Sequence, residues 1–282
     1  MGRYFRPSDL PSVLRLLAEG PSTVLAGGTD VYPAHADRPL RGDVIDISRV
    51  GDLRGIASLP GFWRIGATTT WTDIIAADLP PCFAALQQAA REVGGQQIQN
   101  AGTIGGNLCN ASPAADGVPP LLALDAAVEL ASTDGVRIVP MADFIAGPRR
   151  TVLCPGELLN AVRVPAAPGA RTAARFLKLG SRRYLVISFA MVAAQLAADA
   201  AGRIVAAAIA VGACSPVARR LPSLEAALVG QRASANLTAV VSPDHFAALD
   251  PIDDIRADRA YRLESAWILA SRAIALAQGA LR

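Results

Sequence analysis

Residues that could bind a metal or act as a histidine catalyst are scarce in this sequence of 282 residues. Its two histidines, His35 and His245, stand far apart and lack neighbours that would make either one a ligand, so both are interpreted as loop residues. No two of its four cysteines form the C-x-x-C pair that zinc and iron–sulfur sites usually contain. The sequence therefore predicts no metal site, and such dispersed cysteines are typical of a reducing compartment.

Charge is also scarce, and its two signs are nearly balanced. Charged residues make up 18% of the chain, with 27 basic and 24 acidic residues interspersed. No basic stripe or tail is formed, so nucleic-acid binding is disfavoured. Lys178 is the only lysine, because every other basic residue is arginine. We attribute the arginines to coding bias and interpret the pairs 149–150 and 219–220 as solvated surface or subunit contacts.

Long apolar runs are missing as well. The most apolar stretches, residues 186–198 and 204–214, are shorter than the roughly 18–20 residues that a helix needs to cross a bilayer. Residues 1–11 contain arginines and no apolar core, so they do not resemble a secretory signal. These features predict a cytoplasmic protein without a membrane span.

Hydrophobic periodicity and turn residues predict the elements of the first part of the chain. Ser8 is the expected N-cap of a helix that ends at Gly20, because the leucines and valine between them form one apolar stripe. A long glycine- and amide-rich loop is expected from Gly94 to Asp116. The other expected elements are strands at 22–26, 44–47, 64–70 and 158–164, helices at 82–93 and 121–125, and a hairpin at 127–141.

Residues 165–170 form the clearest boundary, because two prolines and a glycine in six residues end any regular element. We expect one domain at 1–167, with subdomains at about 1–55 and 56–167, and a second domain at 171–282. The second domain should contain a three-stranded antiparallel sheet with helices on one face, and the predicted fold class is α+β. Its expected strands are 175–179, 188–197 and 203–211, and its expected helices are 224–229 and 259–277.

Two glycine-rich loops form the candidate binding site. Residues 25–30 read Leu-Ala-Gly-Gly-Thr-Asp after a strand, and residues 102–107 read Gly-Thr-Ile-Gly-Gly-Asn. Glycine lets backbone N–H groups approach an anion closely, and successive N–H groups bind phosphate oxygens. However, a double glycine after a strand is often only a turn, and neither G-x-G-x-x-G nor the P-loop pattern occurs. The residues alone leave a dinucleotide site and two simple turns as alternatives.

Residues 26–30 together with the run from Asn100 to Asp116 resemble the FAD-binding medium subunit of the molybdenum hydroxylases, the xanthine dehydrogenase and carbon monoxide dehydrogenase family. The resemblance covers nearly the whole chain, because residues 178–183 and 212–216 follow in the family's usual order. It implies an FAD-binding domain, the family's C-terminal domain and non-covalently bound FAD. The residues implied to bind FAD are Val24, Leu25, Ala26, Gly27, Gly28, Thr29, Asp30, Val31, Gly102, Thr103, Ile104, Gly105, Gly106, Asn107, Asn110, Ser112, Asp116, Leu159 and Lys178.

The resemblance assigns these residues different parts of the cofactor. The first loop, 24–31, and the second, 103–107, are implied to hold the pyrophosphate. Asp116 and Lys178 are implied to lie beside FAD, and a compact ammonium at position 178 is not equivalent to a guanidinium. Leu159 is implied to pack on the flavin region, although an ordinary core position is an equal alternative.

The resemblance also implies partner subunits. A small subunit would carry 2Fe–2S clusters and a large subunit would carry molybdopterin, in a dimer of heterotrimers. Electrons would pass from the clusters to FAD and then to an external acceptor, so that this chain is the electron-transfer subunit of an oxidoreductase and needs no catalytic residue of its own. Two other functions stay open: a stand-alone flavin oxidoreductase, in which His35 could carry FAD covalently, and a nucleotide-binding scaffold.

Overall fold

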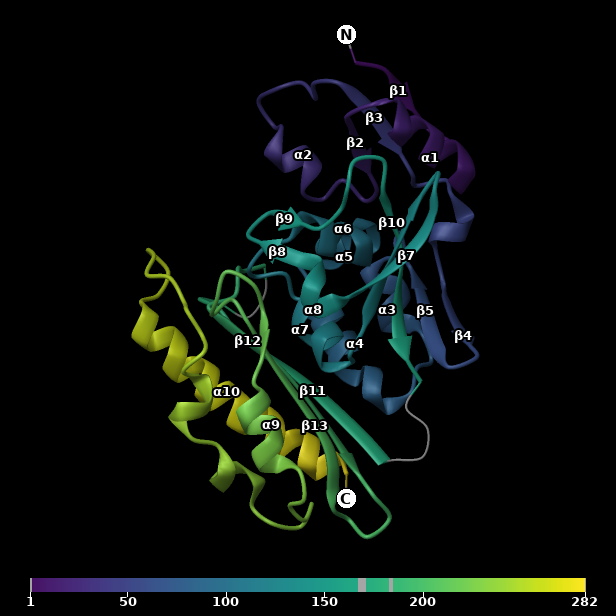
Figure 1. Ribbon diagram of the computed structural model, residues 1–282. Coiled ribbons are helices and arrows are strands. Elements are labelled where there is room, and N and C mark those ends of the chain that lie inside the picture. The colour runs from purple at the N-terminus through teal and green to yellow at the C-terminus, as the bar shows by residue number, and fades with distance from the viewer. Residues whose placement is uncertain (1, 167–170, 183–184, 282) are drawn as a thin grey trace.

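In the described part of the chain, three sheets of three or more strands follow one another, from the N-terminal end at the top of Figure 1 to the C-terminal helices at its base. The computed structural model describes residues 2–166, 171–182 and 185–281. No helix in these ranges is long and apolar enough to span a membrane. The predicted combination of helices and strands is confirmed. The expected boundary at 165–170 falls largely outside the described residues, and the domain limits stay a prediction.

The first sheet is small and parallel, with the strand order β1-β3-β2. Asp9, rather than the expected Ser8, is the N-cap of its first helix, because the Asp9 carboxylate accepts a hydrogen bond from the Ser12 N–H at 2.8 Å. Buried residues of this helix pack against Ile45. The elements are β1 (Tyr4–Phe5), α1 (Leu10–Glu19), β2 (Ser22–Leu25), α2 (Val31–Ala34) and β3 (Asp43–Asp46).

The second sheet is antiparallel, with the order β4-β5-β10-β6-β7. Its strands are β4 (Ile56–Leu59), β5 (Phe62–Gly66), β6 (Ala127–Ser132), β7 (Gly135–Pro140) and β10 (Leu158–Pro165). The helices of this part are α3 (Trp71–Ala76), α4 (Ala84–Glu92), α5 (Gln96–Ala101), α6 (Ile104–Asn110), α7 (Val118–Ala123) and α8 (Met141–Phe144), with 3₁₀ turns at Gly51–Leu53 and Pro81–Phe83. A short hairpin joins β8 (Ile145–Gly147) to β9 (Arg150–Thr151).

Two expectations for this part are wrong. The segment from Gly94 to Asp116 is not one loop, because it folds into α5 and α6. Thr103 caps α6 by accepting a hydrogen bond from the Gly106 N–H at 3.0 Å, and Ile104 is fully buried, so packing outweighs the poor helix propensity of glycine. The expected strand at 64–70 is also too long, since β5 ends at Gly66.

The third sheet has the order β11-β12-β13-β14, one strand more than expected. Its elements are β11 (Arg171–Leu179), β12 (Ala190–Ala198), β13 (Ile204–Gly212), β14 (Arg219–Arg220), α9 (Pro222–Leu228) and α10 (Arg259–Ala280), with 3₁₀ turns at Leu237–Val240 and Pro243–Phe246. Helices α9 and α10 cover one face, as predicted, but α4 and α7 cover the other (Figure 1). Burial on both faces explains why β12 is almost continuously apolar.

Arg220 joins the second and third parts of the chain. Its guanidinium donates to the Glu225 carboxylate at 2.8 Å, to the Asp125 carboxylate at 2.7 Å and to the Leu122 carbonyl at 3.0 Å. Its side chain is 24% exposed, whereas the neighbouring Arg219 is exposed. Arg220 is therefore not a solvated surface residue, and the other interpretation of this pair, a contact with another subunit, stays a prediction.

We expect Arg220→Met to lower the free energy of unfolding by about 1–3 kcal/mol, because the largely buried Glu225 carboxylate loses both guanidinium donors and keeps, among its described donors, only the Ile209 N–H. Urea denaturation followed by circular dichroism measures the change. Arg219→Met is the matched control and should shift stability by less than about 0.5 kcal/mol. Equal effects of the two substitutions would contradict a specific role for Arg220.

Candidate functional site

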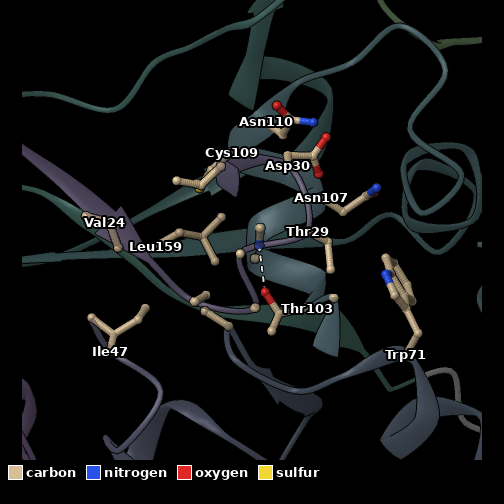
Figure 2. Close-up of a pocket in the computed structure, with 18 of the residues that line it drawn as sticks. Val24, Thr29, Asp30, Ile47, Trp71, Thr103, Asn107, Cys109, Asn110 and Leu159 are labelled. Carbon is tan, nitrogen blue, oxygen red and sulfur yellow. Dashed lines mark hydrogen bonds between the residues drawn. The ribbon is translucent and has the colours of Figure 1, made fainter. Parts of the chain in front are cut away.

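The two glycine-rich loops meet at one cavity of about 480 Å³, shown in Figure 2. This volume is within the range of roughly 300–1,000 Å³ that is typical of small-molecule sites. The first loop follows β2, and the second precedes and enters α6. The cavity brings together most of the residues that the sequence predicted, namely Val24, Ala26, Gly27, Gly28, Thr29, Asp30, Val31, Gly102, Thr103, Gly105, Gly106, Asn107, Asn110 and Leu159.

The loops are held by contacts that only glycine permits. A Cβ atom on Gly27 would lie 1.8 Å from the carbonyl oxygen of Ala101, the last residue of α5, which directly precedes the second loop. A Cβ atom on Gly105 would lie 2.7 Å from the carbonyl oxygen of Ala67, which accepts a hydrogen bond from the Gly105 N–H at 2.8 Å. The glycines therefore do more than make turns, since they let backbone segments from distant parts of the sequence touch around the cavity.

Neutral groups dominate the cavity wall. Among the described residues that line it there is no lysine or arginine, and its charged side chains are Asp30 and Glu157. Glu157 is paired with Arg137 at 2.6 Å, which lowers the pKa of the Glu157 carboxyl. The Oδ1 atom of Asn107 is buried and has no hydrogen-bond partner in the described residues. An unpaired buried acceptor is costly, so this atom points to a ligand that donates to it.

Nine residues that line the cavity were not predicted. Ile47 follows β3, which is parallel to β2. The carboxyl ends of neighbouring parallel strands lie at the same edge of a sheet, so the sequence could have indicated that Ile47 lies near the first loop. Trp71 follows no glycine motif and carried no comparable signal. The full set is Ile47, Ala67, Trp71, Val93, Ile98, Cys109, Leu153, Glu157 and Leu158.

Five predicted residues do not line this cavity. Leu25 and Ile104 are buried with the cores beneath the two loops. Ser112 accepts a hydrogen bond from the Ala114 N–H at 3.3 Å, in the turn that follows α6. Asp116 and Lys178 contact each other instead. That these five residues also contact the cofactor stays a prediction.

Asp116 and Lys178 form a buried ion pair. The Lys178 Nζ lies 3.0 Å from the Asp116 carboxylate, and the two side chains are only 7% and 11% exposed. The ammonium also donates to the Glu92 carbonyl at 3.2 Å, and the Ser188 hydroxyl donates to Asp116 at 3.4 Å. Burial raises the pKa of the Asp116 carboxyl to about 6, and the charge of Lys178 opposes this rise. Lys178 joins β11 to the end of α4, beside a second hollow of about 360 Å³.

The two histidines lie outside the cavity. His35 follows α2 and is exposed, and its Nδ1 lies 2.9 Å from the Val31 carbonyl oxygen. His245 lies in a 3₁₀ turn, where its Nδ1 accepts a hydrogen bond from the Ser242 N–H at 3.1 Å. In the described part of the chain, histidine, cysteine and acidic side chains form no group of three or more that could hold a metal ion.

Known proteins resemble this chain over nearly its whole length. The family model described as the FAD binding domain in molybdopterin dehydrogenase matches residues 1–167, and the model of the CO dehydrogenase flavoprotein C-terminal domain matches residues 175–277. The xanthine dehydrogenase FAD-binding subunit of Escherichia coli O157:H7 is 32% identical in sequence. The alignment covers 99% of this chain and 98% of that subunit. The glyceraldehyde dehydrogenase medium chain of Sulfolobus acidocaldarius is 30% identical, covering 96% of each chain.

Solved structures share the fold as well. A chain of quinoline 2-oxidoreductase from Pseudomonas putida 86 superimposes with a TM-score of 0.89 at 29% identity, covering 100% of this chain and 99% of its own. A chain of carbon monoxide dehydrogenase from Hydrogenophaga pseudoflava superimposes with a TM-score of 0.87 at 29% identity. The match covers 99% of this chain and 98% of the dehydrogenase chain.

Proposed function

Because the chain belongs to the family of FAD-binding subunits of molybdopterin dehydrogenases, we propose that the cavity between its two glycine-rich loops holds FAD. The observation that carries this proposal is the close backbone packing at the two loops, with Gly27 against Ala101 and Gly105 against Ala67, which frames a cavity of suitable size. The unpaired Asn107 Oδ1 also fits a ligand with hydrogen-bond donors.

The chain's own residues bind and orient the cofactor in this proposal. Backbone N–H groups and the hydroxyls of Thr29 and Thr103 offer neutral donors to the pyrophosphate, and the glycines allow its close approach. Val24, Ile47 and Leu159 provide an apolar wall that excludes water. When bound, FAD supplies redox chemistry in one-electron and two-electron steps, while the protein supplies position and solvent control.

The chain is an FAD-carrying electron-transfer subunit of an oxidoreductase rather than a stand-alone flavin enzyme. Relatives of nearly the same length are named as FAD-binding subunits or medium chains of dehydrogenases for xanthine, glyceraldehyde and carbon monoxide. The substrates in these names differ although the chains are similar over nearly their whole length. We therefore propose that substrate is oxidised in a partner and that its electrons enter this chain from outside.

The finer assembly is also a proposal. We propose that a small subunit with 2Fe–2S clusters and a large molybdopterin subunit assemble with this chain as a dimer of heterotrimers. The similarity to the medium chain of carbon monoxide dehydrogenase from Hydrogenophaga pseudoflava supports this arrangement, because a medium chain implies other subunits. We also propose a cytoplasmic location, because all four cysteines carry free thiols.

We expect the purified chain to bind one FAD that acid precipitation releases into the supernatant. Absorbance of the supernatant and chromatography against FAD and FMN standards measure its identity and amount. If the apo-protein fails to take up added FAD, the flavin-binding proposal is wrong. If the flavin stays with the precipitated protein, attachment is covalent and the stand-alone alternative with His35 gains support.

A further inference from the structure

Trp71 occupies a fixed position at one end of the cavity. Its backbone N–H donates to the Gly102 carbonyl at 3.2 Å, and the preceding Thr70 caps α3 and forms a β-bridge with Thr103. The Asp73 carboxylate completes the capping box and is bonded to Arg54 at 2.9 Å. The start of α3 is therefore held to the second glycine-rich loop through its backbone.

The indole ring is enclosed by two glycines. A Cβ atom on Gly102 would lie 3.3 Å from Cδ1 of Trp71, and one on Gly117 would lie 2.7 Å from its Cη2. The same Cβ position on Gly117 is 2.9 Å from the Asn107 Oδ1. The ring thus extends from the second loop to the residue after Asp116, and the unpaired amide oxygen of Asn107 lies close to its far end.

Trp71 lines the cavity and is only 2% exposed, and no hydrogen bond joins its indole N–H to another described residue. Figure 2 shows its nitrogen on the side of the ring that faces Thr29, toward the cavity. Buried tryptophan N–H groups usually find an acceptor. A free donor on Trp71 and a free acceptor on Asn107 at one end of the cavity therefore match a flat heteroaromatic ring whose edge carries both kinds of group.

We propose that Trp71 binds the isoalloxazine ring of FAD, with its indole N–H donating to a ring oxygen or nitrogen. This inference rests on the proposed function. The isoalloxazine edge alternates carbonyl and nitrogen acceptors with an N–H donor, which suits Trp71 and Asn107 together. The opposite end, with Val24, Ile47 and Leu159, offers aliphatic contacts and in this proposal takes the purine, so that Leu159 packs on the adenine and not on the flavin region as the family resemblance implies. Trp71 is thereby a cofactor-contacting residue outside both glycine motifs.

The experiment compares Trp71→Phe with wild-type apo-protein in titrations with FAD and with ADP. Phenylalanine keeps most of the apolar contact and lacks the N–H donor. We expect FAD affinity to fall about fivefold to tenfold, as for the loss of one hydrogen bond, with ADP affinity unchanged because ADP lacks the isoalloxazine. The absorption spectrum of bound FAD should also shift relative to the wild type, since the polarity at the ring edge changes.

Trp63→Phe is the matched control. Trp63 packs edge-to-face on Phe83, with ring centroids 5.7 Å apart, and does not line the cavity, so its substitution should leave FAD affinity and the flavin spectrum unchanged. If Trp71→Phe proves unstable, a chain with Trp63→Phe and Trp267→Phe leaves Trp71 as its only tryptophan. FAD, but not ADP, should then quench its fluorescence almost completely.

The outcomes separate this inference from the proposed function. Unchanged FAD affinity and an unchanged flavin spectrum in Trp71→Phe would overturn it, while FAD binding by the wild type would still stand. A parallel loss of ADP and FAD affinity, with an unaltered flavin spectrum, would place the purine at Trp71 and also overturn it. Failure of the wild type to bind FAD would instead refute the proposed function.

Discussion

Gly27→Ala is expected to abolish most FAD binding and to destabilise the fold. The added Cβ would lie 1.8 Å from the Ala101 carbonyl oxygen and 2.6 Å from its carbonyl carbon, so the backbone of one loop must move. Overpacking of this kind costs about 1–3 kcal/mol, and here the obstacle is backbone rather than a flexible side chain. Separation of the loops would also displace the groups that frame the cavity. FAD affinity should therefore fall more than about tenfold, which corresponds to a loss of more than about 1.4 kcal/mol of binding free energy.

The measurements are chemical denaturation of the apo-protein and titration with FAD. Gly51→Ala is the matched control, because no heavy atom lies within 4 Å of the Cβ that it adds and its backbone conformation suits alanine. This control should retain FAD affinity and should be at least as stable as the wild type. Wild-type FAD affinity in Gly27→Ala would show that the contact between the loops is not needed to form the site.

The sequence predicted the two glycine-rich loops because their function leaves a local signal. A glycine-rich run such as residues 102–107 indicates that backbone segments approach one another too closely for side chains. The close contacts at Gly27 and Gly105 confirm this interpretation. The same glycines misled the prediction of secondary structure. Glycine and asparagine have low helix propensity, yet α6 forms because Thr103 caps it and Ile104 and Leu108 are buried.

Other features depend on contacts between distant segments and leave no local signal. Trp71 reaches the cavity because a β-bridge joins Thr70 to Thr103 across 33 residues of sequence. Lys178, near the end of the edge strand β11, meets Asp116 across 62 residues of sequence, and nothing in the strand's own sequence indicates this partner. The prediction also missed that α4 and α7 cover one face of the third sheet, because both helices precede that sheet in the chain.

Lys178→Met is expected to be the most destabilising substitution among those proposed, by about 3–5 kcal/mol, because it leaves the Asp116 carboxylate buried without its counter-charge. The loss should depend on pH. Burial already raises the pKa of Asp116 from 3.8 to about 6, and removal of the ammonium, which opposes this rise, moves it higher. The folded variant then holds a proton that the unfolded chain has released, so its stability is greatest at low pH and falls as pH rises through the folded pKa. Urea denaturation at pH 5 and pH 8 should show the larger deficit relative to the wild type at pH 8, and a deficit independent of pH would contradict this assignment of the pair.

The double variant Lys178→Met with Asp116→Asn separates the ion pair from any contact with the cofactor. It contains neither buried charge, and asparagine can still accept a hydrogen bond from the Ser188 hydroxyl, so most of the lost stability should return. We expect FAD affinity to stay lower than that of the wild type, because the family resemblance puts Lys178 beside FAD. Lys178→Arg, which keeps the charge but not the compact shape, should likewise bind FAD more weakly. Recovery of both stability and FAD affinity in the double variant would show that Lys178 acts only by neutralising Asp116, and the proposal that it contacts FAD would then be abandoned.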